Sequence, residues 1–443
     1  MNDFAELLVS QLSADVRALP ERVRARMSPE GQVARAGTIA ELRAIAKRRV
    51  PRVAFDYVDG GAGDELTLRR NNAELRATEL RPRVLVDVSA VDTATTVLGQ
   101  PVALPLLSAP MGLTGLMHPA AEVAIARVMH EAGSVSVLAA MASCPIEEVA
   151  AAAAGPLWFQ MYIWRDRGLV ADMLRRAQAA GMSVLVLTLD VPCSSNRDRD
   201  RRNGFSIPPR VTLRALAGGA LHPGWSASFV RNPRIRWGNM PGEGGLTATT
   251  LSSQTNRQFD PSATWDDIGW FRERWNGRLV VKGILHPGDA RQAVRLGAEA
   301  VIVSNHGGRQ LDGAPAAIRA LPTVADAVAG DAEVYFDSGV RRGADIVKAL
   351  ALGARACLAG RALAYGLGAA GEAGARRAVQ ILRRELRVVL ALTGCPSVQD
   401  LDRTWVRPPG GSWTVIPDAA GNGAGVATTP DAADEQSPGG LGD

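Results

Sequence analysis

The succession of apolar runs most constrains what this chain can fold into. Between residues 104 and 360, short runs rich in Val, Ile, Leu and Ala alternate with stretches whose apolar residues recur at helical spacing, among them 120–132 and 345–352. The runs predict eight strands: Leu104–Ala109, Val135–Ala139, Trp158–Ile163, Val184–Asp190, Leu279–Gly283, Ala300–Ser304, Val334–Ser338 and Ala356–Gly360. Repeated strand–helix units imply a parallel sheet. Eight units of short, doubly buried strands favour a closed (β/α)8 TIM barrel of the α/β class over an open sheet.

Composition and charge narrow the class of protein. Of the 443 residues, 47% are hydrophobic and 21% are charged, which is the balance of a soluble globular enzyme. The net charge of +5 is spread along the chain and gives no reason to expect nucleic acid as a partner. The four cysteines lie far apart without a Cys-x-x-Cys pair, so neither a disulfide framework nor a metal site is expected. The sequence has no signal peptide and no apolar run of membrane-spanning length, which predicts a cytoplasmic protein.

Three regions are expected along the chain. Residues 1–37 should form an N-terminal helical extension, interrupted by Pro20 and by a turn at residues 28–31. Residues 38–406 should form the barrel, with residues 191–277 as a long insertion, or lid, between strands four and five. Residues 407–443 contain mainly Gly, Pro, Ala, Asp and Ser, so this tail is expected to be disordered.

The most informative motif follows the sixth predicted strand. Residues 301–312 read Val-Ile-Val-Ser-Asn-His-Gly-Gly-Arg-Gln-Leu-Asp, an apolar run that ends in polar residues and glycines. Barrels carry their active sites at this edge of the sheet. His306 can exchange a proton near neutral pH, and Arg309 offers a permanent charge whose shape suits a carboxylate. The motif therefore predicts a base beside an anion-binding group.

Two further strand ends indicate a phosphate. Residues 337–341 follow the seventh strand and residues 360–361 follow the eighth, and both combine glycine with arginine. Barrels commonly bind phosphate at these positions through backbone N–H groups and an arginine. The Gly-x-Gly-x-x-Gly fingerprint of nicotinamide cofactors does not occur at a suitable place.

The motif around His306 resembles the active-site signature of the FMN-dependent 2-hydroxy acid dehydrogenases and oxidases, and the resemblance covers about residues 38–406. It implies a closed barrel, FMN as cofactor, and oxidation of an L-2-hydroxy acid, lactate- or mandelate-like, to the 2-keto acid. It also implies a homo-oligomer, commonly a tetramer. The substrate-site residues that it implies are the base His306 with its partner Asp190, the carboxylate-binding Arg309 and Arg197, and the hydrogen-bond donors Tyr162 and Tyr57.

The resemblance also suggests how FMN would be held. A lysine at position 282 would stabilise negative charge on the reduced cofactor. Together with the two phosphate-type strand ends, the expected cofactor-binding residues are Gly112, Gln160, Thr188, Lys282, Ser304, Asp337, Ser338, Gly339, Arg341, Gly360 and Arg361. Whether the base removes the carbon-bound proton or the hydroxyl proton stays open, because both routes use the same residues.

Several positions depart from the family pattern. Ala139-Ala140 replaces a serine that often contacts the flavin, and Met141 stands where an aromatic residue often lines the substrate pocket. Gly112 occupies a position where the oxidases usually have alanine, and with the long insertion it favours a dehydrogenase that passes electrons to a quinone or another carrier. The alternatives are an oxidase that reduces O2 to H2O2, an enzyme acting on a larger peptide-derived substrate, and a non-redox phosphate-binding barrel.

The insertion has an unusual composition. Residues 203–242 contain no acidic residue but five arginines (Arg210, Arg214, Arg231, Arg234 and Arg236), interleaved with Trp225, Phe229 and Trp237. This composition suits a membrane surface, although a lid or a subunit interface would explain it equally well. Leu221–Trp225 and Ser252–Thr255 resemble the insertion of the membrane-associated mandelate dehydrogenases. This resemblance favours peripheral contact with the inner face of the cytoplasmic membrane.

Overall fold

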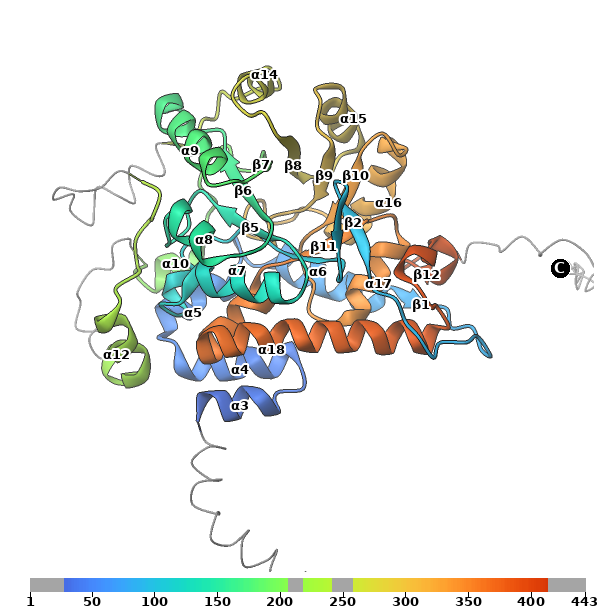
Figure 1. The fold of residues 1–443 in the computed structure, drawn as a ribbon, viewed down its shortest axis with the longest axis horizontal. Helices are drawn as coiled ribbons and strands as arrows, with labels where there is room; N and C mark the ends of the chain where they lie inside the picture. Colours follow the sequence, from blue (N-terminus) through green and yellow to red (C-terminus); the bar gives the residue numbers. More distant parts are fainter. Residues whose placement is uncertain (1–27, 206–217, 241–257, 413–443) are drawn as a thin grey trace, which may run out of the picture.

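A parallel eight-stranded sheet forms the centre of the computed structural model, which describes residues 28–205, 218–240 and 258–412 (Figure 1). The strand order is β4-β11-β10-β9-β8-β7-β6-β5. The strands are β4 (Leu106–Ser108), β5 (Ser136–Ala139), β6 (Leu157–Tyr162), β7 (Val184–Thr188), β8 (Arg278–Ile284), β9 (Ala300–Val303), β10 (Glu333–Phe336) and β11 (Ala356–Ala359). Each coincides with one of the predicted apolar runs.

The sheet closes at Ser108, where the two ends of the strand order meet. The backbone N–H of Ser108 donates a hydrogen bond to the Val135 carbonyl (3.1 Å). Its Oγ accepts one from the Val137 N–H (3.0 Å) and lies 3.0 Å from the Ser136 Oγ. These bonds join β4 to β5, so the predicted TIM barrel is confirmed.

The barrel interior is built from side chains that alternate along each strand with a period of two. The lower part of the interior is apolar and buried, with Val137, Trp158, Val186, Val280, Ile302, Tyr335 and Leu358. The next inward position toward the carboxyl end is polar on several strands, as in Val186-Leu187-Thr188 and Val280-Val281-Lys282. The same period of two therefore produces an apolar core inside the barrel and a polar layer at the carboxyl ends of the strands.

One helix from the outer ring follows each strand, as expected for a (β/α)8 barrel (Figure 1). These helices are α7 (Ala121–Glu131), α8 (Ile146–Ala152), α9 (Arg167–Ala179), α14 (Asp267–Arg272), α15 (Pro287–Arg295), α16 (Ala317–Val328), α17 (Gly343–Ala351) and α18 (Arg361–Thr393). Helix α18 is kinked at Ala370 and Gly371. The stretches predicted as helical at 120–132 and 345–352 are α7 and α17.

The N-terminal helices are α3 (Pro29–Arg35), α4 (Ile39–Arg49), α5 (Arg52–Asp59) and α6 (Leu66–Ala77). Of these four N-terminal helices, α3, α4 and α5 pack against α18, whereas α6 packs against α16 and α17, and α4 lies alongside α18 in Figure 1. The Ser28 Oγ accepts a hydrogen bond from the Gly31 N–H (3.0 Å), so residues 28–31 begin α3. The predicted interruption at 28–31 is wrong, because serine followed by proline is a strong helix-start signal. The rest of the expected extension, residues 1–27, lies outside the described residues.

Two small sheets complete the described chain. The hairpin of β2 (Thr95–Val97) and β3 (Gln100–Val102) contributes Val97 and Val102 to the apolar cluster inside the barrel. Strand β12 (Val406–Arg407) pairs antiparallel with β1 (Glu79–Leu80). The first residue of the predicted tail, Arg407, therefore belongs to a strand, and residues 413–443 lie outside the described residues.

Candidate active site

A polar layer closes the barrel interior at the carboxyl ends of the strands. Three of its members come from or directly follow β8, β9 and β10. The Lys282 Nζ lies 2.9 Å from the Ser304 Oγ and 3.0 Å from the Asp337 Oδ2, and the Ser304 Oγ donates to the same carboxylate oxygen (2.7 Å). Burial opposes ionisation of Asp337, but Lys282 and Ser304 outweigh it and hold the pKa of Asp337 below its usual value. Lys282 is therefore a buried cation with a carboxylate partner.

Strands β6 and β7 add an amide and a hydroxyl to this layer. The Gln160 Nε2 donates a hydrogen bond to the Thr188 Oγ1 (3.0 Å). The Gln160 Oε1 is buried and has no hydrogen-bond partner among the described residues. A buried acceptor without a partner costs roughly 1–3 kcal/mol. We therefore expect a ligand N–H donor to meet Gln160.

A left-handed turn after β9 presents His306. The φ angles of His306, Gly307 and Gly308 are 59°, 65° and 72°, a conformation that glycine adopts readily but that strains histidine. The Ser304 Oγ accepts a hydrogen bond from the His306 N–H (3.0 Å), and the Ser338 Oγ accepts one from the Gly307 N–H (3.0 Å). Two neighbouring strand ends thus hold the strained turn in place.

The His306 imidazole faces the carboxylate of Asp190, two residues beyond β7. Its Nδ1 lies 3.0 Å from the Asp190 Oδ1, which leaves Nε2 as the ring nitrogen available to a substrate. Burial lowers the pKa of His306, with further lowering by Lys282 and Arg309, while Asp190 opposes the change. The imidazole is therefore neutral near pH 7 and able to accept a proton. Gly283 makes room for this pair, since a Cβ there would lie 2.6 Å from the Asp190 side chain.

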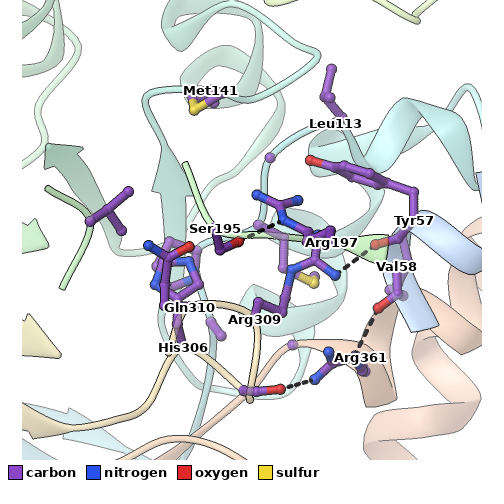
Figure 2. A pocket seen from close by; sticks show the side chains of 18 of the residues that line it. Tyr57, Val58, Leu113, Met141, Ser195, Arg197, His306, Arg309, Gln310 and Arg361 are labelled. Carbon is purple, nitrogen blue, oxygen red and sulfur yellow. Dashed lines mark hydrogen bonds between the residues drawn. The ribbon is translucent and has the colours of Figure 1, made fainter. Parts of the chain in front are cut away.

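Two guanidinium groups lie near Tyr57 in the same cavity (Figure 2). The central carbons of Arg309 and Arg197 lie 5.0 Å and 5.7 Å from the centre of the Tyr57 ring. The Arg309 Nη1 donates to the backbone carbonyls of Tyr57 (2.6 Å) and Gly60 (2.9 Å). The Arg197 Nε donates to the Ser195 Oγ (3.1 Å). Burial lowers the pKa of Arg309, and repulsion from Arg197 adds to this effect. An anion between the two arginines would relieve that repulsion.

Tyr162 and Asp200 lie close to these arginines. Burial raises the pKa of Tyr162, so its hydroxyl keeps its proton and can donate a hydrogen bond. The Asp200 Oδ2 lies 3.8 Å from the Arg197 Nη1, and burial raises the pKa of this carboxyl. One carboxylate against two guanidinium groups leaves this part of the cavity net positive, which suits an anionic substrate.

Arg361 bonds to backbone carbonyls from two different segments (Figure 2). It donates hydrogen bonds to the carbonyls of Val58 (2.9 Å), Gly60 (2.7 Å) and Gly307 (2.8 Å). Burial lowers the pKa of its guanidinium to about 10. Arg361 thereby ties the His306 turn to the segment that carries Tyr57. The sequence indicated a phosphate ligand at this position but not this structural contact.

The predicted site residues gather around one cavity of about 510 Å³, a volume typical of a ligand site. Asp190, Gln160, Thr188 and Ser304 lie behind its wall. The predicted residues that line it are Tyr57, Gly112, Tyr162, Arg197, Lys282, His306, Arg309, Asp337, Ser338, Gly339, Arg341, Gly360 and Arg361. The chain therefore brings together side chains that are separated by up to three hundred residues.

Several cavity residues were not predicted, among them Phe205, Leu113 and Gln310. Phe205 stacks on Tyr57, with ring centroids 4.4 Å apart and an angle of 15° between the planes. Leu113 lies near Tyr57 in Figure 2 and, with Met141, adds apolar surface to the cavity. The Gln310 Nε2 donates to the Asp190 carbonyl (3.1 Å). Gln310 could have been found from its place in the His306 motif, whereas nothing in the sequence marks Phe205 or Leu113.

The second half of the insertion packs on the barrel. Trp237 is buried. Arg234 pairs with Glu148 (2.5 Å), and its Nη1 lies 2.8 Å from the Cys144 Sγ. The Gly238 N–H donates to the Ala142 carbonyl (2.8 Å). Trp237 and Arg234 are therefore not available to a membrane, contrary to the expectation for the whole of residues 203–242.

Helix α12 (Pro223–Arg231) stands apart from the barrel helices in Figure 1. The Trp225 Nε1 donates to the Leu116 carbonyl (2.9 Å), and the Trp225 ring stacks on Phe229. Leu221 and Val230 are each 79% exposed. Arg210, Arg214 and Ser252–Thr255 lie outside the described residues. Among the described residues of the insertion, the surface that could meet a membrane is the neighbourhood of α12.

The cavity suits a flavin nucleotide. Gln160 has a buried acceptor without a partner among the described residues, which suits an N–H group, and the buried Lys282 lines the cavity with its positive charge. At the strand end where phosphate is expected, Ser338 and Gly339 have φ angles of 90° and 115°, and Arg341 lines the cavity. These residues would hold FMN, with the ring near Lys282 and the phosphate near Arg341.

The carboxyl edge of this (β/α)8 barrel carries a partly buried histidine–aspartate pair, two arginines and a nucleotide-sized cavity. These features define an oxidoreductase of the flavin-binding barrel class. Residues 46–408 match the family model for FMN-dependent dehydrogenases, and the chain belongs to this family. The expected cofactor, FMN, and the expected class of enzyme, a 2-hydroxy acid dehydrogenase that forms the 2-keto acid, are thereby confirmed.

The chain is similar to characterised members over most of its length. It is 44% identical over 365 residues to an L-lactate dehydrogenase from Pectobacterium atrosepticum, covering 82% of this chain and 94% of the relative. It is 45% identical over 368 residues to an L-lactate dehydrogenase from Caulobacter vibrioides, covering 82% and 96%. Among solved structures, the monotopic membrane protein (S)-mandelate dehydrogenase matches with a TM-score of 0.81 and 37% identity, covering 84% of this chain and all of that one. A mandelate oxidase matches with a TM-score of 0.74 and 36% identity, covering 84% and 99%.

Proposed function

We propose that the enzyme oxidises a lactate-like L-2-hydroxy acid to its 2-keto acid in the cavity beside His306. The observation that carries this proposal is the meeting of the His306–Asp190 pair with Arg309 and Arg197 in one cavity. A 2-hydroxy acid needs a base for its CH–OH group and a cation for its carboxylate, and this arrangement offers both within one small volume. The L-lactate dehydrogenases at 44% and 45% identity favour a small side chain on the substrate.

Each residue is given a role on physical grounds. Arg309 and Arg197 bind the substrate carboxylate through charge-assisted hydrogen bonds. The Nε2 of His306 takes up one of the two protons that leave the CH–OH group, and Asp190 stabilises the resulting imidazolium. Tyr57 and Tyr162 orient the substrate by hydrogen bonds. When bound, FMN would supply the acceptor for the two electrons and for the second proton that leave the substrate.

We further infer that the electrons pass on to a quinone or a similar carrier at a membrane, with α12 resting on the lipid surface. Within the described residues, no helix is both long and apolar enough to cross a bilayer, so the contact would be peripheral. Leu221 and Val230 would enter the headgroup boundary, and the exposed Arg231 and Arg236 would face anionic lipids. A similar solved structure is described as a monotopic membrane protein, which supports this assignment. A homo-oligomer, as expected from the resemblance, completes the proposal.

Anaerobic stopped-flow spectroscopy of the FMN-loaded enzyme tests the function. L-Lactate should bleach the oxidised flavin absorbance, whereas D-lactate and L-alanine should not, because they lack the correct configuration or the hydroxyl group. (S)-Mandelate in the same series tests whether the space beside Leu113 and Met141 accepts an aromatic side chain. Reoxidation by a quinone analogue should exceed reoxidation by O2; the opposite order would favour an oxidase. Failure of every 2-hydroxy acid to bleach the flavin would refute the proposal.

A further inference from the structure

The base of the insertion, residues 196–205, is fastened to the segment that carries Tyr57, residues 55–65. The central link is Arg199 on the short helix α10 (Asp198–Arg202). Its Nη1 donates to the Asp59 Oδ2 (2.9 Å), and its Nη2 donates to the Glu65 Oε2 (2.6 Å). One guanidinium therefore bridges two carboxylates that lie on either side of a glycine-rich turn. A bidentate arginine bridge fixes direction as well as distance.

The charge balance of the Tyr57 segment depends on this bridge. Asp59 is buried and also pairs with Arg43 (2.6 Å), which together with other hydrogen bonds holds its pKa well below the usual value despite burial. Asp56 lies 3.6 Å from Arg199. The only ion pair of Glu65 within the described chain is the one with Arg199. Loss of Arg199 would thus leave Asp59 paired with Arg43 but Glu65 without a cation, and the turn would lose its ion pairs to α10.

Arg199 also sits next to two groups of the active site. Arg197 is the N-cap of the same helix, so the orientation of α10 determines where the Arg197 guanidinium lies. Phe205, which follows α10, stacks on Tyr57. Yet Arg199 itself does not line the cavity. It can therefore affect the reaction only by setting the position of other residues.

We propose that Arg199 is a positioning residue that holds Arg197 at the correct distance from Tyr57 for a substrate carboxylate. The inference rests on the proposed function, because it treats Arg197 as part of the carboxylate site. Removing Arg199 should weaken substrate binding far more than it slows the oxidation step, because His306 follows β9 and Asp190 follows β7, and in the described structure these two side chains pair with each other and form no hydrogen bond or ion pair with α10. A purely structural residue would instead lower FMN content and rate together.

The test compares Arg199→Met with Arg202→Met in the FMN-loaded enzyme. Arg202 is an exposed arginine on the same helix and serves as the matched control, because within the described residues its side chain donates a hydrogen bond only to the Asp198 carbonyl (3.3 Å). Anaerobic flavin reduction is followed over a range of L-lactate concentrations, which separates the apparent Kd from the limiting rate. Arg199→Met should raise the apparent Kd about tenfold, because a small displacement of a binding group has large effects, while the limiting rate changes by less than about threefold. Titration with oxalate, a carboxylate that cannot be oxidised, should show the same loss of affinity.

Two further variants sharpen the test. Arg199→Lys should recover only part of the affinity, because one ammonium group cannot bridge two carboxylates in the same geometry. Glu65→Gln should raise the apparent Kd by a smaller factor and should add little to Arg199→Met in the double variant, since both changes break the same link. This variant also carries the test if Arg199→Met fails to retain FMN.

The outcomes separate the two claims. If L-lactate does not bleach the wild-type flavin, the proposed function fails and the inference fails with it. If the wild type is bleached but Arg199→Met behaves like Arg202→Met, only the inference is overturned. It is also overturned if Glu65→Gln leaves the affinity for oxalate and L-lactate unchanged, or if full activity returns with lysine.

Discussion

Replacement of Asp190 by asparagine isolates the charge that faces His306. The two side chains meet through one hydrogen bond of 3.0 Å in a partly buried setting, and asparagine keeps the size of the side chain but removes the negative charge. A hydrogen bond to a charged group contributes roughly 1.5–3 kcal/mol and a neutral one roughly 0.5–1.5 kcal/mol. The imidazolium formed when His306 takes up a proton should therefore lose about 1–1.5 kcal/mol of stabilisation, which slows flavin reduction about five- to twelvefold.

The Asp190→Asn substitution should also shift the pH profile of the reaction, in a direction set by the pKa of His306. His306 must be neutral to accept a proton, so activity rises as the pH passes upward through its pKa. Burial already lowers that pKa, and Asp190 acts in the opposite direction. In the asparagine variant only the lowering effects remain, so the acidic limb of kcat/KM should move to lower pH while the plateau falls. General damage to the site would lower the plateau without this displacement.

The assay is anaerobic flavin reduction by L-lactate between pH 5 and pH 8, with FMN content and oxalate affinity measured on the same preparations. Asp198→Asn is the matched control, because this carboxylate pairs with Arg201 on α10 and makes no contact with His306. The reasoning is refuted if Asp190→Asn moves the acidic limb to higher pH, or if it reduces its flavin as fast as the control at every pH.

The remaining predictions concern the substrate, the cofactor and the membrane. Arg309→Met and Arg197→Met should each weaken oxalate binding by about 1.5–3 kcal/mol, measured by flavin difference titration; unchanged affinity in both variants would exclude the carboxylate site. Lys282→Met should lower the reduction potential of the bound flavin, because a buried positive charge favours the reduced, more negative form, and an unaltered potential by dye equilibration would contradict this. A Leu221→Ser, Val230→Ser double variant should sediment less with anionic vesicles than the wild type, and equal sedimentation would remove α12 from the membrane proposal.

For the insertion, composition alone gave a prediction of membrane contact that is wrong for two of its residues. Its arginines and aromatic residues looked like one membrane-facing set, but Arg234 pairs with Glu148 and Trp237 is buried. The partner of Arg234 lies on α8, more than eighty residues earlier in the chain. A segment without acidic residues of its own can thus be neutralised by carboxylates from elsewhere. Local composition cannot detect this, because the pairing depends on how distant elements pack.

The sequence by itself determined the barrel and which side chains are proposed to react. In runs such as Val280-Val281-Lys282, the period of two places an apolar side chain in the barrel core and a polar side chain at the carboxyl end of the strand. Because the strand ends are short, this local pattern decides which residues face inward. The His306 motif also predicted the base and the anion-binding arginine from local sequence, because all of its residues belong to one turn.

Tertiary structure alone decided how these groups are supported. Arg361 contacts the carbonyls of Val58 and Gly307, which lie far from each other in sequence. Arg199 bridges Asp59 and Glu65, which both lie far from Arg199 in sequence. The stack of Phe205 on Tyr57 has the same origin. Such contacts leave no periodic trace in the sequence, because their geometry arises only when barrel closure brings separate loops to one edge. The chain therefore specifies the chemistry locally, whereas the distances between the reacting groups are set by long-range packing.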